Sequence, residues 1–94
     1  GHTASLFPEH DLLKVNDRLI AYITDSPKPP PQRITMTYSL INNAKYSIFA
    51  VAGSGKAEII KNIFLDKKDL PAGAVKAQEK VYWLLDEKSA AYVS

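Results

Sequence analysis

The sequence YSIFAVAGSGKAEIIKNIF at residues 46–64 decides the fold of this chain. Its apolar run at 48–52 is too short for a helix and ends at a glycine-rich turn, so it predicts a strand buried on both faces. After the turn, apolar residues recur at helical spacing and predict an amphipathic helix. The inner face of that helix would carry Ala57, Ile59, Ile60, Ile63 and Phe64. A buried strand, a glycine turn and an amphipathic helix make half of a βαβ unit.

The turn between this strand and this helix is a candidate anion site. It offers free backbone N–H groups and the positive end of a helix dipole, and Lys56 adds a full charge in the first helical turn. The turn is not a P-loop, because Ala50 and Ala57 stand where that motif needs a glycine and a Ser or Thr. Nor is it a full dinucleotide fingerprint, since Glu58 replaces the third glycine. The alternative is a plain strand-to-helix turn with a solvated lysine.

Composition limits the classes of function. The chain has 94 residues and a formal net charge of +2, with no basic run, so composition gives no support for a nucleic-acid partner. It has no cysteine, which excludes a disulfide framework, a thiol nucleophile and a thiolate metal site. No stretch approaches the roughly 20 apolar residues of a membrane span. There is no initiator Met, and Gly1-His2-Thr3 looks like the middle of a longer protein, so we expect part of one domain.

The other segments alternate between predicted strands and helices. Four of the six prolines lie in residues 25–32, which predicts a stiff, extended loop. Ser39 is a candidate N-cap for the helix that follows this region. The order of the elements predicts an α/β fold with a mainly parallel sheet. Besides the central unit, strands are predicted at 18–24, 33–37 and 81–85, and helices at 38–45 and 86–93.

The two histidines lead to different expectations. His2 follows a small residue and precedes the small residues 3–5, a context that would hold an imidazole at a loop edge. There it could act as a general base near neutral pH, although a histidine in such a position is more often a surface residue. His10 lies between Glu9 and Asp11 and is expected to be a solvated surface residue.

Arg33 begins a predicted strand directly after the proline loop. It is either an edge arginine in a surface ion pair or a bidentate phosphate clamp held in place by the stiff prolines. Lys28, inside the loop, is expected to be solvated. The alternative is that it assists Arg33 in binding a phosphate. Tyr82 and Trp83 lie in an apolar strand and are expected in the core. Asp86 follows that strand, and Asp25 follows the strand before the proline loop. Each aspartate is expected to cap or close a turn.

Six separated motifs, taken in order, resemble one family. They are GHTASLFP at 1–8, SPKPPPQRIT at 26–35, SLINNAK at 39–45, VAGSGKAEIIKNIF at 51–64, LPAGAV at 70–75 and WLLDEKSAA at 83–91. Over nearly the whole chain they resemble the C-terminal part of 6-phosphogluconolactonases. The resemblance implies a Rossmann-like three-layer α/β sandwich with a mainly parallel sheet. Residues 1–94 would be the C-terminal part of a single lactonase domain, without its N-terminal half and that half's active-site residues.

The resemblance also implies a reaction and a site. The family hydrolyses 6-phosphoglucono-1,5-lactone to 6-phosphogluconate in the oxidative pentose phosphate pathway, without a metal or cofactor. By position, His2 resembles the base that activates water, while Arg33, Gly55 and Lys56 resemble contacts of the substrate phosphate. We therefore expect a cytoplasmic enzyme that binds a small sugar-phosphate lactone. We expect it to bind neither nucleic acid nor a membrane.

Two alternatives accompany this reading. Glucosamine-6-phosphate deaminases share the fold, but they carry an asparagine–glutamate pair where this chain has Leu6-Phe7, which disfavours aminosugar isomerisation. The other alternative is a non-catalytic fragment that binds sugar phosphate weakly or only associates with its missing half. We expect the 94-residue chain alone to have little or no lactonase activity.

Overall fold

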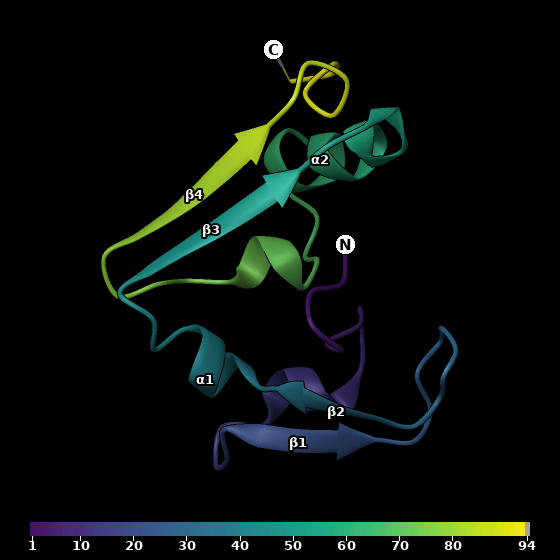
Figure 1. Ribbon diagram of the computed structural model, residues 1–94, viewed down its shortest axis with the longest axis vertical. Helices are drawn as coiled ribbons and strands as arrows, with labels where there is room; N and C mark the ends of the chain where they lie inside the picture. The colour runs from purple at the N-terminus through teal and green to yellow at the C-terminus, as the bar shows by residue number, and fades with distance from the viewer. Residues whose placement is uncertain (94) are drawn as a thin grey trace.

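The computed structural model describes residues 1–93 and contains two small sheets (Figure 1). One sheet is made of β3 and β4 with α2 beside it, the other of β1 and β2, and the N-terminal segment lies between them. No helix in this part of the chain is long and apolar enough to cross a membrane. With η denoting a 3₁₀-helix, the elements are η1 (Asp11–Lys14), β1 (Ile20–Ile23), β2 (Arg33–Met36), α1 (Tyr38–Ile41), β3 (Tyr46–Val51), η2 (Ser54–Lys56), α2 (Ala57–Phe64), η3 (Ala72–Ala74) and β4 (Lys80–Leu85).

The predicted strand–turn–helix unit is present. β3 leads through the glycine turn and η2 into α2, and the chain then returns through η3 to β4. β3 and β4 run parallel, in register from Tyr46 opposite Lys80 to Val51 opposite Leu85. Parallel neighbours need a crossover connection, and here α2 lies within it. The predicted α/β class with a parallel sheet is therefore confirmed.

Aromatic side chains hold α2 against one face of this sheet. Phe49 of β3 stacks on Trp83 of β4 with ring centroids 4.2 Å apart, and Phe64 of α2 meets Trp83 edge-on at 5.1 Å. Such pairs are worth about 0.5–1.5 kcal/mol beyond their buried area. α2 also buries Ala57 and Ile60, two members of the face that the helical spacing predicts. α2 therefore packs against the face of the β3–β4 sheet that carries Phe49 and Trp83.

β1 and β2 form an antiparallel pair in a sheet of their own, with Ile20 opposite Met36 and Ile23 opposite Arg33. The two strands therefore depart from the expectation of a mainly parallel sheet. The proline-rich segment 24–32 reverses the chain without a helix, and antiparallel neighbours need no crossover. A hydrophobic cluster joins the N-terminal segment and η1 to β1. Its buried members are Leu6, Phe7, Leu12, Ala21 and Ile23.

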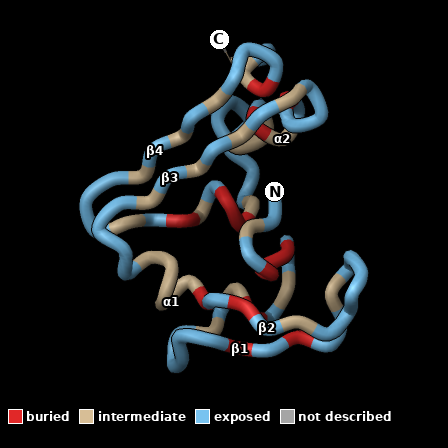
Figure 2. Tube along the Cα trace, viewed as in Figure 1, coloured by how far each residue is buried: buried red, intermediate tan, exposed pale blue. Residues whose placement is uncertain are grey.

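The expectation that the central strand is buried on both faces was wrong. β3 and β4 alternate between exposed and half-buried residues (Figure 2). On the face away from α2, Ile48 is 65% exposed and Leu84 59% exposed. Tyr82 lies on that face too, so it is not a core residue, whereas Trp83 is half-buried on the packed face. The reason is that α2 covers one side of the sheet and no element among residues 1–93 covers the other.

Two predicted helices are shorter than expected. α1 ends at Ile41, its N-cap is Thr37 rather than Ser39, and Asn42 instead uses its side-chain oxygen to accept a hydrogen bond from the Lys76 N–H. This long-range bond fixes the C-cap residue of α1 to the segment before β4. The segment 86–93 forms turns, not a helix.

Candidate functional site

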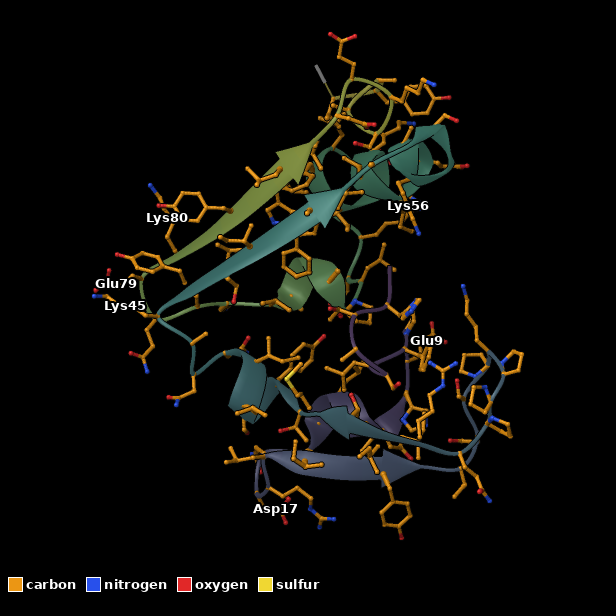
Figure 3. The ribbon with its side chains drawn as sticks, in the orientation of Figure 1. Glu9, Asp17, Lys45, Lys56, Glu79 and Lys80 are labelled. Atoms are coloured by element: carbon orange, nitrogen blue, oxygen red, sulfur yellow. The ribbon has the colours of Figure 1, made fainter. Side chains whose placement is uncertain are left out.

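A cavity of about 260 Å³ opens between the N-terminal segment, the carboxyl end of β3 and the start of α2. His2 and Lys56 both contribute to its wall. Figure 3 shows the Lys56 side chain extending from the start of α2 toward the N-terminal segment. The apolar part of the wall comes from Phe49, Val51, Ile59, Ile60, Ile63 and Trp83. An imidazole and an ammonium group therefore share one largely apolar cavity, the usual setting of a small-molecule site.

The N-terminal segment holds His2 through a tight turn. Thr3 and Leu6 exchange backbone hydrogen bonds of 3.3 and 2.9 Å, and Leu6 is fully buried. The turn brings Phe7 back beneath the imidazole, and the two rings stack with centroids 4.9 Å apart and planes inclined by 23°. Phe7 is itself only 3% exposed. The imidazole is thus supported by a buried ring, and it also forms part of the cavity wall.

The surroundings of His2 favour its neutral form. Partial burial is the largest cause that lowers the pKa of His2 below 6.5, and the positive charges of Lys28, Lys56 and Arg33 lower it further. Burial and nearby cations both disfavour the imidazolium. A neutral imidazole at neutral pH can accept a proton, so the predicted general base has a suitable environment.

The glycine turn before α2 depends on Gly53. Its φ is +97° and its ψ 153°, a region open essentially to glycine alone. Gly55 has no such constraint, and a Cβ added there would meet nothing within 4 Å. Gly55 is exposed in η2 and is not among the residues that line the cavity. Its backbone is therefore open to approach from solvent, as a phosphate contact would require.

Asp86 holds the glycine turn to the end of β4. Its carboxylate accepts hydrogen bonds from the Gly53 N–H at 3.1 Å and from the Ser89 N–H at 2.8 Å. The bond from Ser89, and to a lesser degree that from Gly53, lowers the pKa of Asp86 below 3.8. The expectation that Asp86 caps a turn is confirmed. Its link to the candidate anion turn was not predicted, because Gly53 and Asp86 are adjacent only across the two parallel strands.

Arg33 lies outside the cavity wall and is engaged by the proline loop. Its Nε donates to the Pro30 carbonyl at 3.0 Å, and its Nη2 donates to the carbonyls of Lys28 and Pro29 at 3.0 and 2.9 Å. Its Nη1 lies 3.4 Å from the Ser5 hydroxyl oxygen. Since an arginine has five N–H donors, one on Nη1 remains for another acceptor. The sequence did not predict that carbonyl groups of the proline loop would accept three of the five N–H donors of Arg33.

His10 is not the solvated residue that the sequence predicts. Its Nδ1 accepts a hydrogen bond from the Leu12 N–H and so caps η1, and its Nε2 lies 2.8 Å from an Asp25 carboxylate oxygen. With Nδ1 as acceptor, Nε2 carries the proton and donates it to Asp25. The histidine ties η1 to the start of the proline loop. Among residues 1–93, no cluster of three His, Cys, Asp or Glu side chains could hold a metal ion.

Comparison with known proteins agrees with the resemblance. Residues 1–83 match the family model described as glucosamine-6-phosphate isomerases/6-phosphogluconolactonase. The chain belongs to this family. It is 47% identical over 93 residues to the 6-phosphogluconolactonase of Bos taurus and 46% identical over 93 residues to that of Homo sapiens. Each match covers 96% of this chain but 36% of the relative.

Solved structures of similar proteins share the fold. The crystal structure of devB protein has a TM-score of 0.86 and 30% sequence identity, covering 100% of this chain and 40% of that one. The 6-phosphogluconolactonase of Trypanosoma brucei has a TM-score of 0.77 and 25% identity, covering 100% of this chain and 38% of that one. The chain spans less than half the length of each of these proteins.

Proposed function

We propose that this chain is part of a 6-phosphogluconolactonase, an enzyme that hydrolyses 6-phosphoglucono-1,5-lactone to 6-phosphogluconate. The observation that carries the proposal is the cavity in which His2 and Lys56 meet. Ester hydrolysis needs a base for water, and a phosphorylated substrate needs a cation at a distance from the reacting carbon. The mammalian relatives bear the name of this activity.

In the proposed mechanism, the neutral imidazole of His2 accepts a proton from a water molecule. The water oxygen attacks the lactone carbonyl carbon, and the charge passes to the carbonyl oxygen. When the carbonyl re-forms, the bond between the carbonyl carbon and the ring oxygen breaks, and the ring oxygen takes the proton from the His2 imidazolium and leaves as a hydroxyl. The carboxylic acid so formed releases its proton to solvent, so the products are a carboxylate, an opened sugar chain and a proton. The lowered pKa of His2 supports this role, since a base must be unprotonated before it acts.

The phosphate end of the substrate would be held by Lys56, Gly55 and Arg33. Lys56 stands at the start of α2, where its charge adds to that of the helix N-terminus. No atom within 4 Å of a Cβ built at Gly55 would obstruct a phosphate that approaches its backbone. Arg33 retains an Nη1 donor, and its proline-loop contacts support the proposal by limiting its motion.

The remaining parts of the proposal concern the whole protein. Residues 1–94 would form the C-terminal part of one lactonase domain, and further active-site groups would come from the other part. The reaction belongs to the oxidative pentose phosphate pathway, and we place the enzyme in the cytoplasm. The small coverage of the relatives supports a longer domain. The competing candidate is a non-catalytic fragment that binds sugar phosphate or associates with its missing half, and the uncovered apolar face of the β3–β4 sheet favours such an association.

The test is a direct assay of the complete polypeptide that carries this chain. Hydrolysis releases a proton, so the rate can be followed in a pH-stat with freshly made 6-phosphoglucono-1,5-lactone and corrected for spontaneous opening. The unphosphorylated lactone is the control, and we expect a much lower kcat/KM for it. No acceleration of either lactone, together with measurable binding of 6-phosphogluconate, would favour the non-catalytic candidate.

A further inference from the structure

The proline loop fixes the backbone of one exposed lysine. The Ser26 hydroxyl donates to the Lys28 carbonyl at 2.8 Å and accepts from the Lys28 N–H at 3.2 Å. The Ser26 N–H in turn donates to the Pro31 carbonyl at 3.1 Å and closes the loop. Proline has a fixed φ, so the residues on either side of Lys28 have little freedom. The backbone of Lys28 is therefore held in place while its side chain remains exposed.

Arg33 ties this lysine to the segment that carries His2. Its guanidinium binds the Lys28 carbonyl at 3.0 Å and also lies over the ring of Phe7, 5.6 Å from the centroid. Phe7 is the ring on which His2 stacks. Lys28, Arg33, Phe7 and His2 therefore form one continuous chain of contacts. The proline loop cannot shift far without disturbing the support of the imidazole.

The positive charges around His2 lack acidic partners. No salt bridge among residues 1–93 involves Lys28, Arg33 or Lys56. All three cations act on the same imidazole, and the charge of Lys28 has a larger effect on the pKa of His2 than that of Lys56 or Arg33. Like charges gathered without carboxylates repel one another and are stabilised by an anion.

We propose that Lys28 is a further binding residue for the phosphate of the substrate, presented beside Arg33 by the proline loop, with Ser26 as its positioning residue. This inference rests on the proposed function, since it names one more contact of the same substrate. An ammonium group suits a phosphate as a strong point charge, and a pre-ordered lysine loses less freedom on binding. Ser26 acts through Lys28 by holding its backbone, and Arg33 holds the same backbone in addition to its own proposed contact with the phosphate.

The test uses Lys28→Ala in the complete polypeptide, with Lys76→Ala as a matched control that removes another exposed lysine. We expect Lys28→Ala to raise KM for the phosphorylated lactone about tenfold with kcat nearly unchanged, and to match the parent on the unphosphorylated lactone. Lys28→Arg should restore part of the affinity. Ser26→Ala, which keeps the charge but frees the loop, should raise KM by a smaller factor.

Other outcomes would overturn the inference. If Lys28→Ala has the same KM as Lys76→Ala, the lysine is solvated. If it lowers kcat on both lactones, Lys28 acts at the reacting carbon and not on the phosphate. Binding of inorganic phosphate, measured by calorimetry, separates this inference from the proposed function. A parent that binds phosphate but hydrolyses no lactone would refute the activity alone, and the Kd of Lys28→Ala for phosphate would still decide the role of Lys28.

Discussion

At the scale of single residues, His2 is defined by what surrounds it. A buried phenylalanine ring supports the imidazole, and the charges that act on it are positive. A histidine in a Ser-His-Asp triad has a carboxylate partner that stabilises its protonated form. No salt bridge among residues 1–93 pairs His2 with a carboxylate. In this part of the chain, the environment of His2 therefore favours the neutral imidazole over the imidazolium, as the proposed general base requires.

The first prediction concerns the removal of this base. In the complete polypeptide, His2→Ala should lower kcat on the phosphorylated lactone by about 10²–10⁴-fold, because general-base catalysis contributes that much to the transition state. KM should change little, since the imidazole is not proposed to hold the substrate. Steady-state kinetics measure both constants. Turnover at the parent's rate would mean that another group activates the water.

The pH dependence gives a second readout of the same residue. The folded pKa of His2 is lowered, so the neutral base persists below pH 6.5 and the acid limb of kcat/KM should have its midpoint below 6.5. The same shift means that the folded state resists protonation, so the contribution of His2 to stability is lost as pH falls below 6.5. The limb should be absent in His2→Ala. A midpoint above 6.5 in the parent would contradict this reading.

The second prediction distinguishes the effects of Lys56→Ala and Arg33→Ala on substrate binding and on loop stability. Hydrogen bonds to charged groups are worth roughly 1.5–3 kcal/mol, so Lys56→Ala should raise KM for the phosphorylated lactone about tenfold or more. On the unphosphorylated lactone it should behave like the parent. Arg33→Ala should show the same selectivity plus a loss of loop stability, because three loop carbonyls lose their donor. Equal losses on both lactones in Lys56→Ala would remove it from the phosphate site.

At the scale of elements, the glycine turn offers a matched pair of substitutions for the third prediction. Gly53→Ala should destabilise the complete polypeptide by about 1–3 kcal/mol, because an L-residue is strained at this φ and ψ. Gly55→Ala meets no atom within 4 Å, so its stability should stay within about 0.5 kcal/mol of the parent. Denaturant midpoints measure both. If Gly55 approaches the phosphate, Gly55→Ala should raise KM without changing the midpoint.

The fourth prediction concerns the contact that joins this turn to β4. The folded pKa of Asp86 is lowered, so its contribution to stability is present above about pH 3.9 and is lost as pH falls further. Asp86→Asn should therefore lower Tm at neutral pH. The difference from the parent should shrink as the pH falls below about 3.9, because the parent's carboxylate then becomes protonated in the unfolded state first and in the folded state at lower pH. A constant difference in Tm from pH 7 to 3 would show that the charge of Asp86 has no part in the effect.

At the scale of the whole molecule, both small sheets leave an apolar face uncovered. In the β1–β2 sheet Ile34 is 79% and Tyr22 70% exposed, and in the β3–β4 sheet Ile48 is 65% exposed. Two strands alone are marginally stable in water, and three or more with a covered hydrophobic face are needed for independent stability. Buried residues lie in the N-terminal segment, β1, β2, α2, η3 and the turn after β4, away from these uncovered faces (Figure 2).

The fifth prediction follows for the isolated 94-residue chain. It should bind a hydrophobic dye such as ANS, unfold without a sharp transition and show little or no lactonase activity, because its sheets expose apolar surface to water. Dye fluorescence, circular dichroism on heating and the pH-stat assay measure the three properties. Cooperative unfolding combined with robust turnover would refute the prediction.

The sequence by itself determined the parts of this protein that depend on neighbours along the chain. The apolar run, the glycines and the helical spacing of residues 46–64 predicted β3, its turn and α2, because strand and helix periods are local properties. The motifs that contain His2 and Lys56 predicted the family. Asp86 was placed at a turn because it directly follows a strand. The strand, the helix and the turn depend only on residues a few positions apart, whereas the family resemblance depends on the order of motifs along the chain.

The tertiary structure alone decided which distant groups meet. Strand direction in β1 and β2 follows from the reversal of the proline loop, and the same reversal gives Arg33 the loop carbonyls as partners. His10 meets Asp25, and Gly53 meets Asp86, only after the chain has folded. Burial is also a property of the whole molecule, because the same alternating apolar strand is covered or exposed according to what packs against it. The sequence pattern records which side chains are apolar, and only the assembled elements decide which of them lose contact with water.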